Sequence, residues 1–408
     1  MVAKIKMVEG KEEALRWEPQ KICRRAWIGA KYVSGLVSVI TPTHNCSRFL
    51  VQAMDSVWLQ TYRPIEIIVV DDGSTDNTRE VLEEWRNNTC QDKSFAVRSF
   101  HQMQKGAPAA RNKGLLESQG EYIQYLDADD MLSPGKIASQ VAILSRSDVK
   151  KVAAYGPWHH FSISKRHILV YKPHHGSNGR GWLKDWLSGW FTPNHSLLWT
   201  RSDLMELGPW DESLTADDDG EYAMRYLAFG GQLIFCPEAW VYYRQNPNLV
   251  LFGDSISGQC TGSSIRSRIR ITRRMEQFLA ESGLLDSEYR HALSHRYYEI
   301  AKNYTRGNHA LRRLCLQDFR RLSRDGHVPG TSRHRMLVRL LGFVLTQKLR
   351  FLTLSVLRIP TQFPTVSVRT LDELRTLDRP VSQEPMGSHM SRTDCSGTVR
   401  KEVVCRPH

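Results

Sequence analysis

Short, mainly apolar runs mark the first half of the chain. They cover residues 36–41, 65–70 and 122–126, and β-branched and aromatic side chains dominate them. Runs of this length predict strands that are buried on both faces. A more exposed strand is predicted at residues 95–100.

Polar loops and helical periodicity separate these runs. Phe49, Ala53 and Val57 recur at helical spacing after the first run, and residues 71–76 offer a glycine turn and capping side chains before the next helix. Residues 106–114 open a further helix that leads to the third apolar run. Because strands and helices alternate, we expect an α/β fold with a mostly parallel sheet and right-handed crossovers.

Aspartates follow two of the predicted strands directly. Asp71 and Asp72 end the second apolar run, and Asp127, Asp129 and Asp130 follow the third. Open α/β sheets place their ligands at the carboxyl ends of the strands. Like charges crowded there repel unless a cation compensates them, and hard oxygen ligands suit Mg²⁺ or Mn²⁺ carrying a diphosphate. A single Asp-x-Asp would indicate a solvated turn, but the second acidic strand end favours a ligand site.

Four motifs occur in order along this half of the chain. They are Thr-Pro-Thr-His-Asn at 41–45, Val-Val-Asp-Asp-Gly-Ser-Thr-Asp at 69–76, Ala-Ala-Arg-Asn-Lys-Gly at 109–114 and Tyr-Leu-Asp-Ala-Asp-Asp at 125–130. Through them, residues 36–244 resemble a family 2 glycosyltransferase with the GT-A fold. The resemblance implies a Rossmann-like mixed sheet with helices on both faces.

The resemblance also implies a site for a nucleotide-sugar donor. Pro42, Thr43 and one of Asp71 and Asp72 would hold the uracil and ribose of a UDP-linked sugar. The alternative for Asp72 is that it only orders the turn before Gly73. Arg111 lies at the start of a helix, where it would contact phosphate or base, and its alternative is a surface salt bridge.

A divalent cation, Mg²⁺ or Mn²⁺, is implied at Asp127 and Asp129, with Asp127 also facing the donor. Their spacing places both side chains on one face of an extended strand end, whereas Asp130 faces the other way and either caps the next helix or touches ligand. The cation would act as a Lewis acid on the leaving diphosphate. Relatives carry a metal-binding His shortly after the Tyr-Arg of the last strand. Here Asn246 or water would substitute, or metal binding is weaker than in the family.

A later stretch resembles the family's pattern on the acceptor side. Residues 208–214 are followed by residues 218–221 and Arg225, where relatives carry Phe-Asp-Glu and then Glu-Asp. Asp218 replaces the usual Glu. The resemblance implies inversion by direct displacement, with Asp219 as the general base and Asp218 as its neighbour. A shift by one residue, or a solvated acidic helix start, stays open because the aspartates are contiguous.

Three tryptophans have two interpretations. Trp182, Trp186 and Trp190 would stack on sugar rings in an acceptor groove, or they belong to the core. Trp186 and Trp190 are four residues apart, which is ordinary helix packing. We therefore favour the core.

Composition sets the remaining limits. The chain has 408 residues, with 41% hydrophobic and 24% charged residues, which is typical of a soluble protein. Its 8 cysteines are scattered and include no Cys-x-x-Cys, so we expect a reducing compartment and no zinc site. The N-terminus lacks the apolar stretch of a secretory signal. We therefore expect a cytoplasmic reaction.

We predict four segments. Residues 1–35 form an extension, residues 36–250 the catalytic domain, residues 265–358 a basic α-helical region and residues 359–408 a polar, disordered tail. The helices of the basic region are predicted at 265–282, 287–304, 309–323 and 335–357.

The basic region carries the excess positive charge. Residues 265–358 contain 20 Lys and Arg and 7 Asp and Glu, so their excess of 13 equals the net charge of the whole chain. Arg339, Lys348 and Arg350 argue against a membrane-spanning helix. The helices either pack on the catalytic domain or contact an anionic membrane surface at the inner face of the plasma membrane, which would suit a lipid-linked acceptor. Nucleic-acid binding is disfavoured, because no RNA motif or recognition helix is present.

The pattern as a whole predicts an inverting, metal-dependent hexosyltransferase. It would move a sugar from a UDP-linked donor to a glycan or lipid-linked acceptor in polysaccharide biosynthesis. The alternative from another class is a catalytically silent protein that binds nucleotide sugars or serves as a basic scaffold.

Overall fold

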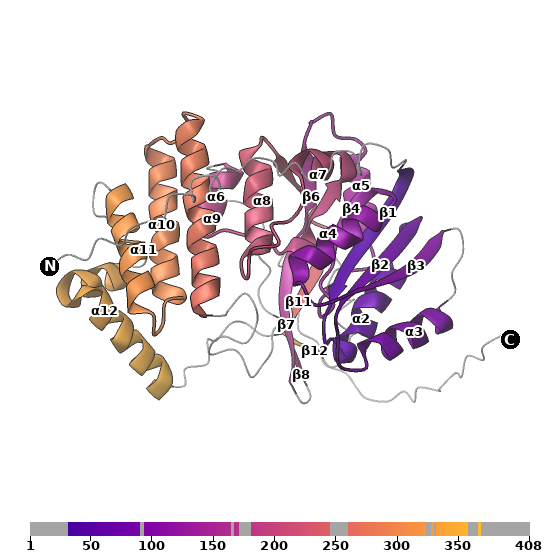
Figure 1. Cartoon of the computed structure of the whole chain (residues 1–408), viewed down its shortest axis with the longest axis horizontal. Coiled ribbons are helices and arrows are strands. Elements are labelled where there is room, and N and C mark those ends of the chain that lie inside the picture. Colours follow the sequence, from indigo (N-terminus) through magenta and orange to yellow (C-terminus); the bar gives the residue numbers. More distant parts are fainter. Residues whose placement is uncertain are drawn as a thin grey trace, which may run out of the picture.

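A sheet body built by the first part of the chain lies beside a group of helices built by the later part (Figure 1). The computed structural model describes residues 32–89, 94–164, 167–170, 181–244, 260–323, 328–329, 332–357 and 366–368. Residues 1–31 of the predicted extension and Asn246 lie outside this part of the chain.

The main sheet has seven strands in the order β10-β6-β9-β4-β1-β2-β3. Strands β4, β1, β2 and β3 are parallel neighbours, and β10 is parallel to β6. Strand β9 runs antiparallel to both β4 and β6, so the sheet is mixed. The bounds are β1 Val33–Thr43, β2 Ile65–Asp72, β3 Phe95–Gln102, β4 Gly120–Tyr125, β6 Val152–Tyr155, β9 Leu198–Thr200 and β10 Gln232–Phe235.

Helices cover both faces of this sheet, as predicted. Val37 and Val39 of β1 belong to one buried cluster with Leu50 of the first helix. Ile68 of β2 instead packs with Ala110 of α4 in another cluster. Successive strand residues therefore bury against different helices, which explains the uninterrupted apolar runs. The helices are α2 Ser47–Trp58, α3 Thr78–Asn88, α4 Ala107–Glu117 and α5 Lys136–Leu144.

The last glycine of the 109–114 motif has a packing role. A Cβ atom on Gly114 would come within 2.4 Å of Ile40 Cγ2. Only glycine therefore allows α4 to lie this close to β1.

A second sheet has five strands in the order β12-β8-β7-β11-β5. Strand β5 follows the Asp127–Asp130 stretch directly and pairs antiparallel with β11. Strand β12 falls within the predicted disordered tail but pairs with β8, so the structure differs from the prediction at these three residues. The bounds are β5 Met131–Leu132, β7 Trp158–Ser164, β8 His167–Val170, β11 Val241–Arg244 and β12 Val366–Val368.

The later part of the chain is helical, as predicted. Four smaller elements, α6 Trp182–Leu187, η2 Asn194–Ser196, α7 Arg201–Leu207 and α8 Asp218–Ala228, precede it. The basic region then forms α9 Gly262–Glu281, α10 Ser287–Asn303, α11 His309–Leu322 and α12 Ser332–Leu357. Gly342 has φ 74° inside α12, so α12 is two helical pieces joined at a kink. None of the helices within the described ranges is long and apolar enough to span a membrane.

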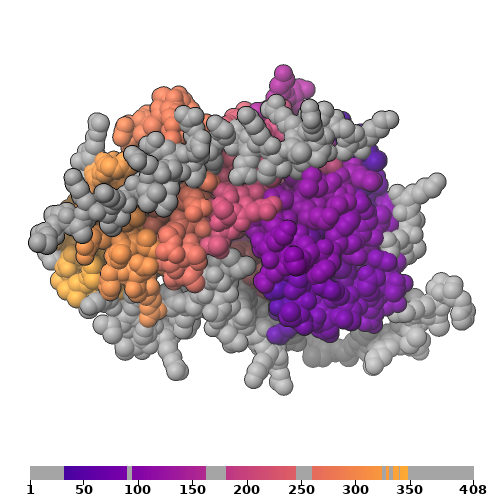
Figure 2. All heavy atoms as spheres, in the orientation of Figure 1, coloured from indigo at the N-terminus to yellow at the C-terminus, as the bar shows by residue number. Residues whose placement is uncertain are grey.

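Helices α9, α10 and α11 pack on the catalytic domain, which was the simpler interpretation of the basic region. Ile265 and Ile269 of α9 and Leu293 of α10 share one buried cluster with Tyr125 of β4 and Trp199 of β9. The space-filling view shows the helical part directly beside the region of α8 (Figure 2). A continuous apolar cluster of this kind joins the two parts into one folding unit.

This shared cluster predicts how one truncation affects stability. Leu293 is 0% exposed, so Leu293→Ala should lower the free energy of unfolding by roughly 2 to 5 kcal/mol through lost burial and a cavity. Leu284, which is 50% exposed, gives the matched control, and Leu284→Ala should have little effect in urea unfolding. Equal losses for the two variants would contradict the shared core.

Candidate active site

Parallel strands bring the predicted site residues to one edge of the main sheet. Thr43 at the end of β1 is in register with Asp71 of β2, and Asp71 is in register with His101 of β3. The backbone N–H of Leu126 donates to the carbonyl of Ile40, so the chain stays beside β1 as it leaves β4. The carboxyl ends of these four strands therefore line a single edge.

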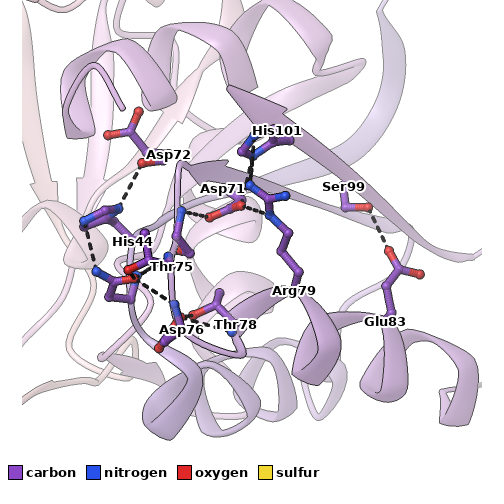
Figure 3. A network of polar contacts seen from close by, with 12 residues as sticks. His44, Asp71, Asp72, Thr75, Asp76, Thr78, Arg79, Glu83, Ser99 and His101 are labelled. Carbon is purple, nitrogen blue, oxygen red and sulfur yellow. Dashed lines mark hydrogen bonds and ion pairs between the residues drawn. The ribbon is translucent and has the colours of Figure 1, made fainter. Parts of the chain in front are cut away.

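Asp71 is held ionised by donors from two neighbouring elements. Its carboxylate accepts from the backbone N–H of Ser74 at 3.0 Å and from Arg79 Nε at 2.6 Å, and His101 Nδ1 lies 3.0 Å away (Figure 3). Burial alone would raise the pKa of Asp71, but these hydrogen bonds outweigh it and lower the pKa below its usual value. Arg79 and His101 were missed from the sequence, because neither lies in a motif and the strand register was unknown.

Asp72 organises the turn that leads into α4. Its carboxylate accepts from Gln102 Nε2 at 2.7 Å and from the backbone N–H groups of Lys105 and Gly106 at 2.8 and 2.7 Å. Its carbonyl accepts from His44 Nδ1 at 2.9 Å (Figure 3). The Asp72 carboxylate therefore orders the turn before α4 rather than the turn before Gly73, and its donor-binding role stays a prediction.

The loops after β1 and β2 are tied together. Asn45 Oδ1 accepts from the backbone N–H of Thr75 at 2.8 Å, and the backbone N–H of Cys46 donates to Thr78 Oγ1 at 3.0 Å. Beneath them, Pro42 and Thr43 are buried, and Thr43 Oγ1 has no hydrogen-bond partner among the described residues. An orphan buried hydroxyl at a strand end is the kind of group that a ligand satisfies.

Arg111 is a buried bridge rather than a surface residue. Its Nη2 donates to Asp127 Oδ1 at 2.7 Å and its Nη1 to Asp218 Oδ2 at 2.6 Å, while the guanidinium lies over the Trp210 ring at 4.7 Å. Burial alone would lower the pKa of Arg111, but the two carboxylates raise it, so the group stays charged. The alternative for Arg111, a salt bridge on the surface, is therefore wrong, because its guanidinium is buried. Its contact with phosphate or base stays a prediction.

The carboxylates after β4 differ in pKa. Burial alone would raise the pKa of Asp127, but Arg111 lowers it. The pKa of Asp129 is raised to about 6, by burial and then by the charge of Asp127. Asp130 neither caps a helix nor points to open solvent: it is 1% exposed and accepts from the backbone N–H of Arg244 at 2.7 Å.

Asp127 and Asp129 fit a hard divalent cation. The raised pKa of Asp129 shows that negative charge is crowded there, and a cation would relieve this crowding. In the described ranges no group of three His, Cys, Asp or Glu side chains is arranged to hold a metal by itself. Mg²⁺ is commonly held by one or two carboxylates, with water and substrate phosphates as the remaining ligands. The pair suits that mode of binding.

The three aspartates at the start of α8 have different partners. Asp217 pairs with Arg296 of α10, and Asp218 pairs with Arg111. Asp219 has no arginine partner among the described residues, and its carboxylate accepts from the backbone N–H of Gly220 at 2.8 Å. Asp219 is therefore the aspartate of the three that stays available to a substrate.

Asp219 also has the pKa of a base that works near neutrality. Its pKa is raised to about 7, by desolvation among the surrounding protein atoms and then by the charges of Asp218 and Asp217. Part of its surface is nevertheless exposed, so a substrate can reach it. A pKa close to the working pH is what general base catalysis requires.

The predicted core role of the tryptophans agrees with their packing. Trp186 is 5% exposed, and Trp182 and Trp190 are partly buried against the same cluster. The rings of Trp182 and Trp190 lie 5.4 and 5.7 Å from the ring of Tyr155. Both contacts are edge-to-face, an arrangement that aromatic rings adopt in a packed core.

Comparison with known proteins supports the family. Residues 38–199 match the family model described as "Glycosyl transferase family 2". An uncharacterised glycosyltransferase of Rickettsia typhi is 31% identical over 201 residues, which are 48% of this chain and 59% of that protein. GlyG of Streptococcus pneumoniae is 35% identical over 140 residues, which are 34% of this chain and 44% of GlyG. Residues 38–199 are therefore a family 2 glycosyltransferase domain, which confirms the resemblance.

The similarity covers only part of these relatives. The chain spans about three fifths or less of the length of the curated relatives that it matches. The structure of S. aureus TarS in complex with UDP-GlcNAc has a TM-score of 0.48 and 16% identity, covering 70% of this chain and 90% of that one. A similarity at this TM-score does not indicate which ligand this chain binds.

The raised pKa of Asp219 predicts a pH profile. A base must be unprotonated to accept a proton, so kcat/KM should rise with pH through about 7 and level off above it. An aspartate with an ordinary pKa would give a flat profile over the same range. Sugar transfer measured at saturating Mn²⁺ checks this, and a flat profile from about pH 5.5 to 8.5 would contradict Asp219 as the base.

Proposed function

We propose that this protein is an inverting, metal-dependent glycosyltransferase that uses a nucleotide-sugar donor. The observation that carries the proposal is the bridge of Arg111, which binds Asp127 of the cation pair and Asp218 beside the base. One guanidinium thus joins the residues proposed for the donor diphosphate to those proposed for the acceptor hydroxyl. Direct displacement needs these two groups on either side of one sugar carbon.

Each residue has a separate task in this mechanism. Asp127 and Asp129 would hold the divalent cation, which as a Lewis acid stabilises the leaving diphosphate. Asp219 accepts the proton of the acceptor hydroxyl as that oxygen bonds to the sugar. Arg111 balances the charge of Asp127 and Asp218, so that Asp219 does not face two uncompensated neighbours.

We propose a UDP-linked hexose as the donor and a glycan or lipid-linked acceptor in polysaccharide biosynthesis, on the cytoplasmic side of the membrane. The donor part rests on the resemblance at Pro42, Thr43, Asp71 and Asp72. Family 2 membership of the domain supports a nucleotide sugar in general. A screen of several UDP and GDP sugars with Mn²⁺ separates this from the alternative, a silent nucleotide-sugar-binding or scaffold protein, which would hydrolyse none of them.

Two substitutions separate cation binding from base catalysis. Asp129→Asn removes a charge at nearly constant volume and should lower UDP release by orders of magnitude, because the cation is lost. Asp219→Asn should lower transfer at least about 100-fold while donor binding stays, since a general base affects rate rather than affinity. Asp148→Asn, at an exposed site, is the matched control.

Each substitution has its own contradictory outcome. Full turnover of Asp129→Asn at saturating Mn²⁺ would remove Asp129 from the cation site. Loss of donor binding in Asp219→Asn would instead move Asp219 to the donor side.

Peripheral membrane contact through α12 is part of the proposal. The apolar side chains Met336, Leu337, Leu341, Val344 and Leu345 are 37–55% exposed on this helix. Arg339 is exposed on the same helix and would face anionic headgroups. Helices α9 to α11 contribute less, because their apolar faces are already buried against the catalytic domain.

Flotation with anionic liposomes tests α12. The protein should float at low salt, and less at about 1 M salt, where the Debye length falls to about 3 Å. Leu341→Asp combined with Arg339→Gln should abolish flotation and leave hydrolysis of the soluble donor unchanged. Arg313→Gln, at an exposed site on α11, serves as the control. A wild type that does not float at low salt would end the membrane proposal.

A further inference from the structure

The turn that carries Asp127 and Asp129 is clamped by β11. The backbone N–H of Asp130 donates to the carbonyl of Asp127 at 3.1 Å, which closes the turn. Arg244 of β11 makes two hydrogen bonds to this turn. Its backbone N–H donates to Asp130 Oδ1 at 2.7 Å, and its Nε donates to the carbonyl of Asp129 at 2.6 Å. Arg244 Nη2 also donates to Gln52 Oε1 at 2.6 Å, so the clamp reaches α2.

A buried histidine approaches the same turn from a different element. His195 Nδ1, from η2, lies 3.1 Å from Asp130 Oδ2, and the two side chains are only 2% and 1% exposed. The turn that carries His195 is itself fixed, because Gln124 Nε2 donates to the carbonyl of His195 at 2.9 Å. Gln140 Nε2 likewise donates to the carbonyl of Ser196 at 2.8 Å. His195 is therefore held by rigid structure on one side and faces Asp130 on the other.

The contact between the two side chains is incomplete. The atoms are close, but the ring is not aligned for a good hydrogen bond, and Asp130 Oδ2 and His195 Nε2 have no hydrogen-bond partner among the described residues. An unsatisfied buried polar atom costs roughly 1 to 3 kcal/mol. Two unsatisfied buried atoms lie beside the predicted cation site. A pair that served only to stabilise the fold would be expected to satisfy them.

We infer that His195 is a positioning residue for the cation site: through Asp130 it holds the turn with Asp127 and Asp129 in the orientation that a divalent cation needs. His195 Nδ1 faces Asp130 Oδ2 at 3.1 Å, and Arg244 binds both the Asp130 carboxylate and the Asp129 carbonyl, so the position of Asp130 is coupled to that of its neighbour Asp129. Carboxylates and histidines behind metal ligands act in this way in other sites, and their loss typically weakens metal binding 10- to 100-fold. This inference rests on the proposed metal-dependent function.

The experiment measures Mn²⁺ binding to the full chain in the presence of UDP, from the free Mn²⁺ signal in electron paramagnetic resonance. His195→Leu removes the donor toward Asp130 and should weaken Mn²⁺ binding about 10- to 100-fold. His195→Asn places an amide donor at the position of Nδ1 and should retain most of the affinity. Activity of His195→Leu should recover as Mn²⁺ is raised to saturation, because the residue does not touch the substrate.

His159→Leu is the matched control. His159 is also buried, at 6% exposed, but its ring stacks on Trp240 with centroids 4.4 Å apart. Its loss should leave Mn²⁺ affinity unchanged. If His195→Leu does not fold, Asp130→Asn tests the same link and must weaken Mn²⁺ binding by a similar factor.

The outcomes distinguish this inference from the function on which it rests. Wild-type affinity for Mn²⁺ in His195→Leu would overturn the positioning role alone. Equal losses in His195→Leu, His195→Asn and His159→Leu, together with equal drops in melting temperature without metal, would also overturn it, because they indicate general destabilisation. A wild type that binds no Mn²⁺ with UDP present would instead overturn metal dependence.

Discussion

The guanidinium of Arg111, buried between Asp127 and Asp218, is the contact on which the geometry of the site depends. A charge this deeply buried is stable only when it is paired. Here the single guanidinium pairs with two carboxylates from different parts of the chain. One follows β4, and the other lies at the start of α8. Removing Arg111 would leave both carboxylates without the cation that they share. The bridge therefore fixes the distance between the two halves of the site as well as their charge.

The charge around this bridge is still in excess. Arg111 faces Asp127 and Asp218 directly, and Asp129 and Asp219 lie beside them. The excess appears in the raised pKa of Asp129, to about 6, and of Asp219, to about 7. Both pKa values are raised first by desolvation and then by neighbouring aspartates, which are Asp127 for Asp129 and Asp218 and Asp217 for Asp219. The first favours a divalent cation as a ligand, and the second gives Asp219 the basicity that proton transfer needs.

The basic helices contribute to the same balance. Arg274 of α9 pairs with Asp211 at 2.5 Å, and Arg296 of α10 pairs with Asp217. Both aspartates lie in the loop that leads into α8. The arginines therefore anchor this loop and neutralise two of its charges, whereas Asp219 has no arginine partner in the described part of the chain. Some of the positive charge of the basic region, at Arg274 and Arg296, therefore forms ion pairs beside the candidate site.

Local patterns predicted most of the fold and half of the site. The apolar runs at 36–41 and 65–70 lie within β1 and β2, and the predicted helices at 287–304 and 309–323 match α10 and α11 within one residue. Strand β9 was not predicted, because three residues are too few to show a period. The aspartates of this candidate site lie in motifs, so a local pattern can point to them, and their roles stay predictions.

The partners of those aspartates were not found from the sequence. Arg79, His101, Arg244 and His195 reach the site through strand register and tertiary packing, which no local pattern encodes.

The two oxygens of Asp127 show how a cation and Arg111 can be bound together. Oδ1 accepts from Arg111, whereas Oδ2 has no hydrogen-bond partner in the described part of the chain, and the side chain is 36% exposed. A carboxylate can serve a guanidinium with one oxygen and a metal with the other. A cation at Oδ2 therefore need not displace Arg111, and the link from Arg111 to Asp218 stays in place. The proposed roles of Asp127 in donor binding and of Asp219 in proton transfer are therefore compatible with a single arrangement of the site.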